Sequence, residues 1–261
     1  MKIVQLKYLF WYVVDGLRKS TKCDLRILFV CGFFACMVLV LDAVMAPFFS
    51  PLVSTQNTNF IVFAQNENNL TLSDLVNQGA PYYGNISSSS LVIVDFSDFQ
   101  CHLCKRHVDN TEPQINSTFV QKGEATYVFK HLPNRGFDSK PTASAAQCTN
   151  DQGKFWEYHK TLYKNQGPID SGWASAENLK RFATQIQGLD INQFNSCFDG
   201  KKYESFVDND IALANSLGFT ETPSFIIMNA DGSNIKKISG PKPFPIFETV
   251  INDMRQESNS Q

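Results

Sequence analysis

The sequence predicts an α/β fold in which a small sheet is interrupted by a block of helices. Two β-rich runs, at residues 91–96 and 125–132, flank a helical segment, which is the pattern of a parallel βαβ unit. Residues 140–218 then place apolar residues three or four apart, as helices do. A hairpin pattern and a last helix pattern follow between residues 223 and 256. The expected order of elements is therefore β, α, β, several helices, β, β, α.

A basic and then apolar segment precedes this domain. The first 26 residues carry six Lys or Arg side chains against two Asp. An uninterrupted apolar run begins at residue 27, and a helix over residues 25–46 would be roughly 33 Å long, enough to cross the hydrocarbon core of a membrane. The positive-inside rule places residues 1–24 in the cytoplasm and everything after residue 46 on the outer side.

The alternative to this transmembrane anchor is a cleaved signal peptide. The letters "VMA" before Pro47 have the small residues of a cleavage site. In the first case the domain stays attached to the membrane, and in the second it is secreted. Residues 47–88, which are rich in Ser, Thr and Asn with one short helix pattern, are expected to form an extracytoplasmic tether.

Export of the domain decides how the seven cysteines are interpreted. Three of them lie in or beside the apolar run, where a buried thiol behaves as a small apolar residue. The other four face an oxidising compartment, in which free thiols tend not to persist. These four are Cys101, Cys104, Cys148 and Cys197. Four cysteines in that compartment are most simply two disulfides.

The predicted domain is discontinuous in sequence. Residues 89–139 and 219–256 supply the strands and the helices around them, and residues 140–218 form a helical insertion. Between the first two strands, the helix expected over residues 101–121 is bent or broken around Pro113, because proline cannot continue the hydrogen bonds of a helix interior.

A pair of cysteines two residues apart lies in the stretch "DFQCHLCKRH", residues 98–107. Cys101 follows the first strand and stands at or near the N-cap of the helix, where free backbone N–H groups and the helix dipole favour an anion. A thiolate there is stabilised relative to the thiol. Since only the reduced state gains this energy, the disulfide becomes a stronger oxidant. We predict that Cys101 is the exposed nucleophile and that Cys104, one turn later and more buried, is the resolving thiol.

Two further features accompany the pair. Asp95 lies in the apolar run of the first strand, where a carboxylate is costly unless it has a partner or a task. We predict that it exchanges a proton with Cys104 through water, with Lys130 as its counter-charge; the alternative is that Asp95 points to solvent at the strand end. Thr222-Pro223 directly precedes a strand, which predicts a loop with a cis peptide bond that folds against the cysteines and presents a backbone edge to an extended substrate.

In these motifs the chain from about residue 91 to 255 resembles the DsbA-like oxidoreductases of the thioredoxin fold. The similarity rests on four stretches in the family's order: "VDFSDFQCHLCKRH", "FKHLP", "AAQCTNDQGKFWEYH" and "LGFTETPSFII". The resemblance implies a thioredoxin core with a helical insertion and a disulfide exchange activity. It also implies Cys101 and Cys104 as the redox pair and Thr222-Pro223 as the cis peptide beside them.

One position departs from the family pattern. Members often have proline directly after the first cysteine, whereas this chain has His102. A protonated His102 would lower the pKa of Cys101 further, while a neutral, outward-facing His102 would do little. His107 and His131 are expected at the surface or in packing rather than as ligands, and His159 is expected to pack or cap in the helical block.

Cys148 and Cys197 fall in two different segments of the helical insertion. A bridge between them would close a loop of about 50 residues, worth on the order of 4 kcal/mol in the chain-entropy account. We predict a structural disulfide here, and two separate buried thiols are the alternative.

Together these features predict a membrane-tethered enzyme that passes the Cys101-Cys104 disulfide to exported cysteine-containing proteins without a cofactor. A membrane redox partner would reoxidise it, because no quinone or flavin site is recognisable. Two alternatives stay open: a reductase or isomerase with the same fold, and a module in which the two thiolates and His102 or His107 hold Cu(I) or Zn(II). A net charge of −2 gives no reason to expect nucleic acid as a partner.

Overall fold

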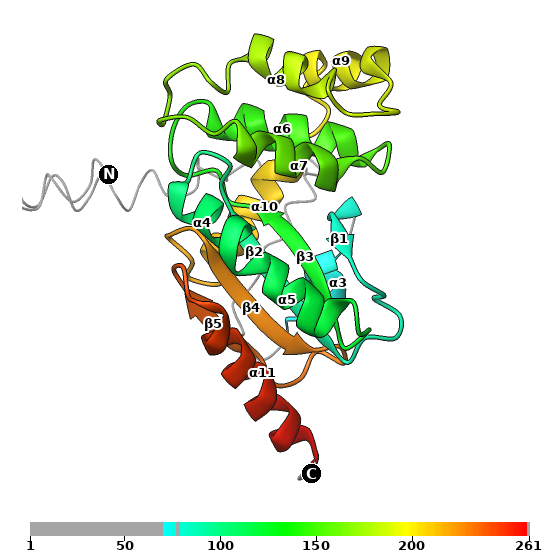
Figure 1. The fold of residues 1–261 in the computed structure, drawn as a ribbon, viewed down its shortest axis with the longest axis vertical. Helices are drawn as coiled ribbons and strands as arrows, with labels where there is room; N and C mark the ends of the chain where they lie inside the picture. Colours follow the sequence, from blue (N-terminus) through cyan, green and yellow to red (C-terminus); the bar gives the residue numbers. More distant parts are fainter. Residues whose placement is uncertain (1–69, 77–78, 260–261) are drawn as a thin grey trace, which may run out of the picture. The chain divides into compact units, whose positions relative to one another are not determined.

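The computed structural model describes residues 70–76 and 79–259, and within them a five-stranded sheet forms the core (Figure 1). The strand order is β1-β3-β2-β4-β5, with β2 and β3 parallel and the other neighbours antiparallel. The strands are β1 (Tyr82–Tyr83), β2 (Leu91–Ser97), β3 (Ala125–His131), β4 (Ser224–Asn229) and β5 (Lys236–Ser239). The predicted parallel βαβ unit and the later hairpin are both confirmed.

The N-terminal predictions fall largely outside the described residues. This holds for the segments 1–24 and 25–46 and for the tether up to residue 69. The short helix expected in the tether is α3 (Leu72–Val76), whose Leu75 is buried. Among the helices that the structure does describe, none combines the length and the apolar character needed to span a bilayer.

Strands β2 and β3 are buried along their whole length, which suits their nearly continuous apolar sequences. On one face of the sheet Ile93 packs in a cluster with Phe247, and on the other face Val94 packs in a cluster with Leu213. The last helix of the chain and the helix that precedes β4 supply these two partners. They are α11 (Phe244–Asn259) and α10 (Glu204–Ser216).

The segment after β2 consists of three consecutive helical pieces. Helix α4 (His102–Asn110) ends at Thr111, α5 (Glu112–Ile115) carries Pro113 in its first turn, and the π-helical segment η3 (Asn116–Val120) follows. Pro113 has no N–H group to continue the hydrogen bonds of α4, so the ladder stops there. The prediction of a helix broken around this proline is confirmed.

The helical insertion shares one core cluster with the rest of the domain, because residues such as Phe129 of β3 and Cys104 of α4 belong to it as well. Its first four helices are α6 (Ser139–Asn150), α7 (Phe155–Lys164), α8 (Ala176–Ala183) and α9 (Ile191–Asp199). In Figure 1, α6 and α7 lie between the sheet and the pair α8 and α9. The starts of α8 and α9 follow the expected capping chemistry, because Ser175 and Asp190 accept hydrogen bonds from N–H groups of the first turn.

A disulfide joins α6 to α9 inside the insertion. The sulfur atoms of Cys148 and Cys197 are 2.01 Å apart and the Cα atoms 5.9 Å apart. Both residues are buried in a cluster that includes Phe155 and Phe194. The predicted bridge is confirmed, and the alternative of two separate thiols is wrong.

Strand β1 was not predicted. It has two residues, which pair antiparallel with β3 so that Tyr82 lies beside Val128 and Tyr83 beside Tyr127. Two residues are too few to show the alternation that marks a strand. The pairing stacks the Tyr83 ring on the Tyr127 ring, with centroids 5.1 Å apart, at one edge of the sheet.

Lys130 does not face Asp95, so that prediction is wrong. In the parallel register Asp95 lies beside Phe129, and Lys130 lies beside Phe96. Because side chains alternate along a strand, Lys130 points to the opposite face of the sheet. There its Nζ pairs with Oδ1 of Asp210 at 2.9 Å, and both side chains are buried.

Candidate active site

The cysteine pair begins helix α4 at the carboxyl end of β2. Cys101 is the N-cap residue, with φ −81° and ψ 115°, and no side chain caps this helix end. The backbone N–H groups of Leu103 and Cys104 interact with the Cys101 sulfur instead and favour its thiolate. Both thiols are free in this structure, which is therefore the reduced form of the pair.

The two thiols have opposite pKa shifts. The pKa of Cys101 is lowered from 9.0 to about 5, chiefly because the Cys104 thiol donates a hydrogen bond to the thiolate. Burial opposes this shift, and the Thr222 side chain reinforces it. The pKa of Cys104 is raised well above 9.0 by burial and by the neighbouring Cys101 sulfur. At neutral pH the first sulfur is therefore an anion and the second is a thiol.

The Thr222-Pro223 peptide bond is cis and lies against the cysteine pair. In its thiol form Cys101 Sγ donates a hydrogen bond to the Thr222 carbonyl oxygen at 3.3 Å. Cys101 is only 1% exposed, so the expectation of an exposed nucleophile is wrong. The sulfur is less accessible than predicted because it lies against the loop that leads into β4.

Asp95 is fully buried, so the alternative of a solvent-facing carboxylate is wrong. The Ser97 hydroxyl donates to Oδ1 at 2.5 Å, and the Tyr127 hydroxyl donates to Oδ2 at 2.9 Å. Burial raises the pKa of Asp95 from 3.8 to about 7, against the effect of these two hydrogen bonds. A carboxyl group with this pKa can both hold and release a proton near neutral pH, as an acid–base group must.

Two partners of Asp95 were missed in the sequence. Ser97 comes two residues later and shares its face of the strand, and it also interacts with Cys104, whose pKa it lowers. A polar residue at this spacing from a buried carboxylate is a signal that could have found Ser97. Tyr127, which also hydrogen-bonds His107 Nε2 at 3.0 Å, is set by the pairing of β2 with β3 and has no comparable local signal.

A second buried carboxylate holds the loop between β2 and α4. Asp98 accepts hydrogen bonds from the backbone N–H groups of Gln100, Asn134 and Arg135, each at 2.8 Å. Gln100, the residue before the first cysteine, donates from Nε2 to Asp170 Oδ1 at 2.9 Å and accepts from the Asp170 N–H at 2.8 Å. Neither residue was predicted from the sequence. Their hydrogen bonds hold the stretch of backbone that leads into Cys101.

The histidines divide between the surface and the interior. His102 is the first residue of α4 and is exposed beside the pair, so its influence on Cys101 stays a prediction. His107, His131 and His159 are at most 2% exposed. Their expected role in packing is confirmed, and the surface alternative for His107 and His131 is wrong.

Replacing His159 with phenylalanine is expected to stabilise the protein. The side chain is buried among aromatic rings, and neither ring nitrogen has a hydrogen-bond partner within the part of the chain that the structure describes. An unpaired buried polar group costs about 1–3 kcal/mol. We expect the variant to gain about 1 kcal/mol in free energy of unfolding near neutral pH, measured by urea denaturation.

The gain from this His159 substitution is expected to grow in acid. Burial lowers the pKa of His159 from 6.5 to about 3. Between these values the unfolded chain binds a proton that the folded protein does not, so the wild-type protein loses stability as the pH falls. The variant lacks this loss, which amounts to at most about 1.4 kcal/mol per pH unit. A stability difference independent of pH would contradict the assignment of a neutral, buried imidazole.

The metal-binding alternative drew on the two thiolates and on His102 or His107. Among residues 70–76 and 79–259, no group of three or more His, Cys, Asp or Glu side chains is arranged to hold a metal ion. His107 instead directs Nε2 to the Tyr127 hydroxyl.

Known proteins are similar to this chain in sequence. Residues 77–251 match the family described as Thioredoxin, which is more than half of the chain. Disulfide bond formation protein D of Bacillus subtilis (strain 168) is 23% identical over 152 residues, which cover 58% of this chain and 68% of that protein.

Solved structures share the fold. Wolbachia pipientis α-DsbA1 superposes with a TM-score of 0.60 and 24% identity, covering 72% of this chain and 98% of that one. Oxidised BdbD from Bacillus subtilis gives a TM-score of 0.59 and 23% identity, covering 68% and 94%. At these identities the structures establish the common fold.

Proposed function

The chain belongs to the thioredoxin family and is a DsbA-like thiol:disulfide oxidoreductase, and from this premise we propose that it passes its Cys101-Cys104 disulfide to exported proteins. The observation that carries the proposal is the pair of opposite shifts, in which the pKa of Cys101 is lowered to about 5 and that of Cys104 is raised. Only the reduced form gains energy from a stabilised thiolate. The oxidised form is therefore the less stable one and gives its disulfide away.

The reaction begins when a substrate thiolate attacks Cys101 Sγ of the oxidised pair. The bond between Cys101 and Cys104 breaks, a mixed disulfide with the substrate forms, and Cys104 leaves as a thiolate. Asp95, whose pKa is about 7, gives a proton to this buried sulfur. A second substrate thiolate then attacks the substrate sulfur of the mixed disulfide and releases Cys101 as a stabilised thiolate. Two electrons pass from the substrate to the pair.

The loop at Thr222-Pro223 is proposed to align the substrate. Its backbone leads into β4 beside the sulfur, so an extended peptide can form main-chain hydrogen bonds there while its cysteine reaches Cys101. Exposed His102 is proposed to influence the pKa of Cys101 from the surface side. The Cys148-Cys197 bridge lies in the core of the insertion and serves stability.

The same proposal extends to location and domain organisation. Residues 25–46 anchor the chain, residues 1–24 stay in the cytoplasm, and the domain works on the extracytoplasmic side, with secretion after signal cleavage as the second possibility. A membrane partner accepts the two electrons and restores the disulfide. The thioredoxin-like part comprises residues 89–139 and 219–256, with 140–218 inserted.

The equilibrium reduction potential of the full chain in detergent tests the direction of exchange. We expect a value nearer to the figure of about −120 mV for DsbA than to the figure of about −270 mV for thioredoxin. A value close to the thioredoxin figure would favour the reductase alternative. Failure of the pair to form a reversible disulfide would overturn the proposed function altogether.

A further inference from the structure

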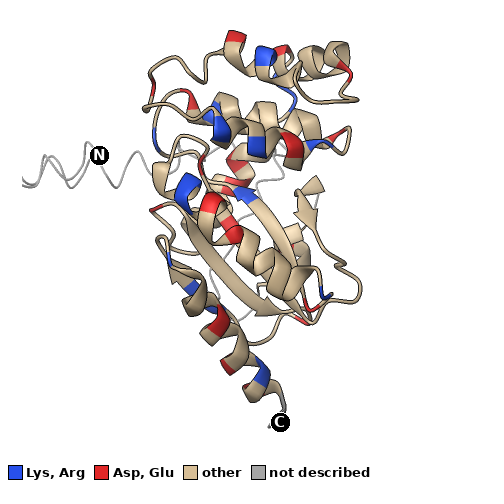
Figure 2. Cartoon of the chain, in the orientation of Figure 1, with Lys and Arg blue, Asp and Glu red and all other residues tan. Residues whose placement is uncertain are grey.

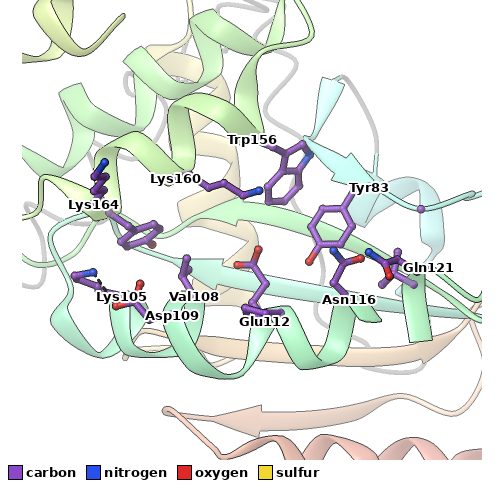
Figure 3. Close-up of a pocket in the computed structure, with 14 residues that line it drawn as sticks. Tyr83, Lys105, Val108, Asp109, Glu112, Asn116, Gln121, Trp156, Lys160 and Lys164 are labelled. Atoms are coloured by element: carbon purple, nitrogen blue, oxygen red, sulfur yellow. Dashed lines mark hydrogen bonds and ion pairs between the residues drawn. The ribbon is translucent and has the colours of Figure 1, made fainter. Parts of the chain in front are cut away.

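A cavity of about 790 Å³ lies between helices α4 and α5 on one side and α7 on the other (Figure 3). Glu112 and Lys160 line it from facing helices, together with the aromatic rings of Tyr83 and Trp156. Figure 2 shows the wider charge pattern, in which α4 and α7 each carry both basic and acidic residues. The reaction described above uses none of these groups.

Glu112 is a buried carboxyl group in the wall of this cavity. It is 8% exposed, and its carboxylate points from α5 into the cavity toward Lys160 (Figure 3). Its Oε2 atom has no hydrogen-bond partner among the described residues, and neither does the buried Tyr83 hydroxyl, which points into the same space. A buried carboxyl group without a full set of partners is costly, which indicates a task other than packing.

An aromatic pair joins the cavity to the redox site. Tyr83 stacks on Tyr127 at an interplanar angle of 16°, and the Tyr127 hydroxyl donates to Asp95 Oδ2 at 2.9 Å. The charges of Asp95 and Glu112 both act on the Tyr127 hydroxyl and raise its pKa. Asp95, Tyr127, Tyr83 and Glu112 therefore form one cluster that runs from the buried strand to the cavity.

Asp95 needs a connection to the cavity, and through it to solvent protons, if it donates a proton to Cys104 as proposed. Each disulfide donated leaves Asp95 without the proton that it gave to Cys104, and Asp95 itself is fully buried. We propose that Glu112 is a positioning residue that acts through Asp95 by returning a proton to it from the cavity, beside the stacked rings of Tyr83 and Tyr127. The inference rests on the proposed function. For each disulfide donated, one proton passes from solvent to Glu112, from Glu112 to Asp95, and from Asp95 to the Cys104 sulfur.

The charges around Glu112 suit this role. Burial, and then the charge of Asp95, raise the pKa of Glu112 from 4.5 to about 8, while Lys160 of α7 opposes the shift. Glu112 therefore carries a proton at neutral pH and can give it up. The remaining charged groups of the cavity wall are exposed Lys164 on α7 and, on α4, the ion pair of half-buried Lys105 with exposed Asp109.

The test is the substitution Glu112→Gln, which keeps the shape of the side chain and removes its titration. The rate at which dithiothreitol reduces the oxidised full chain is measured across the pH range from about 5 to about 9. We expect the variant to lose about tenfold near neutral pH, less than the factor of about 100 that a direct general acid contributes. We also expect the inflection near pH 8 to disappear from its pH profile.

Two comparisons separate this role from a structural one. Asp109→Asn removes an exposed carboxylate one turn away on the same cavity, and it should leave the rate and the pH profile unchanged. In an Asp95→Asn background, Glu112→Gln should cause no further loss, because Glu112 acts through Asp95. A wild-type pH profile in Glu112→Gln, or an equal loss in both backgrounds, would overturn the inference.

The outcome for the wild-type chain keeps this inference distinct from the proposed function. If wild-type protein exchanges its disulfide and Glu112→Gln behaves identically, only the role of Glu112 fails. If the wild-type chain does not exchange at all, the proposed function fails first. Urea denaturation of Glu112→Gln serves as the folding control, and we expect no loss of stability, because the substitution removes a buried ionisable group.

Discussion

Replacing Cys101 with serine is expected to abolish disulfide donation, with a loss of at least about a thousandfold in the rate of oxidation of a reduced protein substrate. Serine has nearly the same size, so the fold and the contact with the Thr222 loop are retained, but no disulfide can form. The measurement is the rate of substrate thiol loss in the absence of other oxidants. Residual activity within about tenfold of wild type would mean that another group carries the reaction.

The matched substitution at Cys104 is expected to behave differently. Cys104→Ala removes the hydrogen bond that contributes most to the low pKa of Cys101, so that pKa should rise from about 5 toward 9.0. Cys104→Ser retains a donor and should give a smaller rise. Both variants keep the nucleophile but lack the resolving thiol, so when the Cys101 thiolate attacks a disulfide of an oxidised substrate protein, the mixed disulfide should accumulate, detected on non-reducing gels. An unchanged Cys101 pKa in the alanine variant would contradict the account of the shift.

Removing the bridge in the insertion is expected to have the largest effect on stability. The double variant Cys148→Ala, Cys197→Ala should lose about 4 kcal/mol in free energy of unfolding, because the bond spans a sequence separation of 49 residues and restricts the unfolded chain. Both residues are also buried between α6 and α9, so the substitution leaves small gaps in packing. Urea denaturation measures the loss.

A single substitution provides the control for this bridge. Cys148→Ala also breaks the bond but keeps the Cys197 side chain, so its stability should lie close to that of the double variant if the constraint on the unfolded chain dominates. A loss below about 1 kcal/mol in the double variant would show that the bridge contributes little. Although the bridge shares a core cluster with the redox pair, neither of its cysteines contributes to the shift of the Cys101 pKa, so this pKa should be unchanged in both variants.

The elements that could be predicted from sequence are those whose pattern is local. The strands β2 and β3 are apolar runs, the break at Pro113 follows from a missing N–H, and the insertion follows from helical periodicity. Strand β1 could not be predicted, because two residues at Tyr82–Tyr83 carry no pattern and depend on their pairing with β3.

The residues of the candidate site also divide into those that a local motif marks and those that depend on the assembled fold. Cys101, Cys104 and the cis peptide at Thr222-Pro223 are marked by motifs, and the structure brings them together. The position of Lys130 was predicted wrongly, because which face a side chain occupies depends on the register between strands.

The partners of Asp95 show the same limit. Tyr127 reaches this carboxylate from a neighbouring strand, and Glu112 approaches the same cluster from a helix across the cavity. Contacts of this kind are made by the assembled sheet and helices, so no short stretch of sequence records them.

The thiolate titration of the reduced full chain tests the central claim most directly. The rate of alkylation of Cys101 is followed against pH, and Cys104 does not interfere because its pKa lies well above 9.0. We predict a midpoint at about 5, since the Cys104 thiol, the Thr222 side chain and the start of α4 all stabilise the anion. A midpoint near the ordinary thiol value of 9.0 would contradict the account, because the pair would then gain no thiolate stabilisation when it gives its disulfide away and becomes reduced.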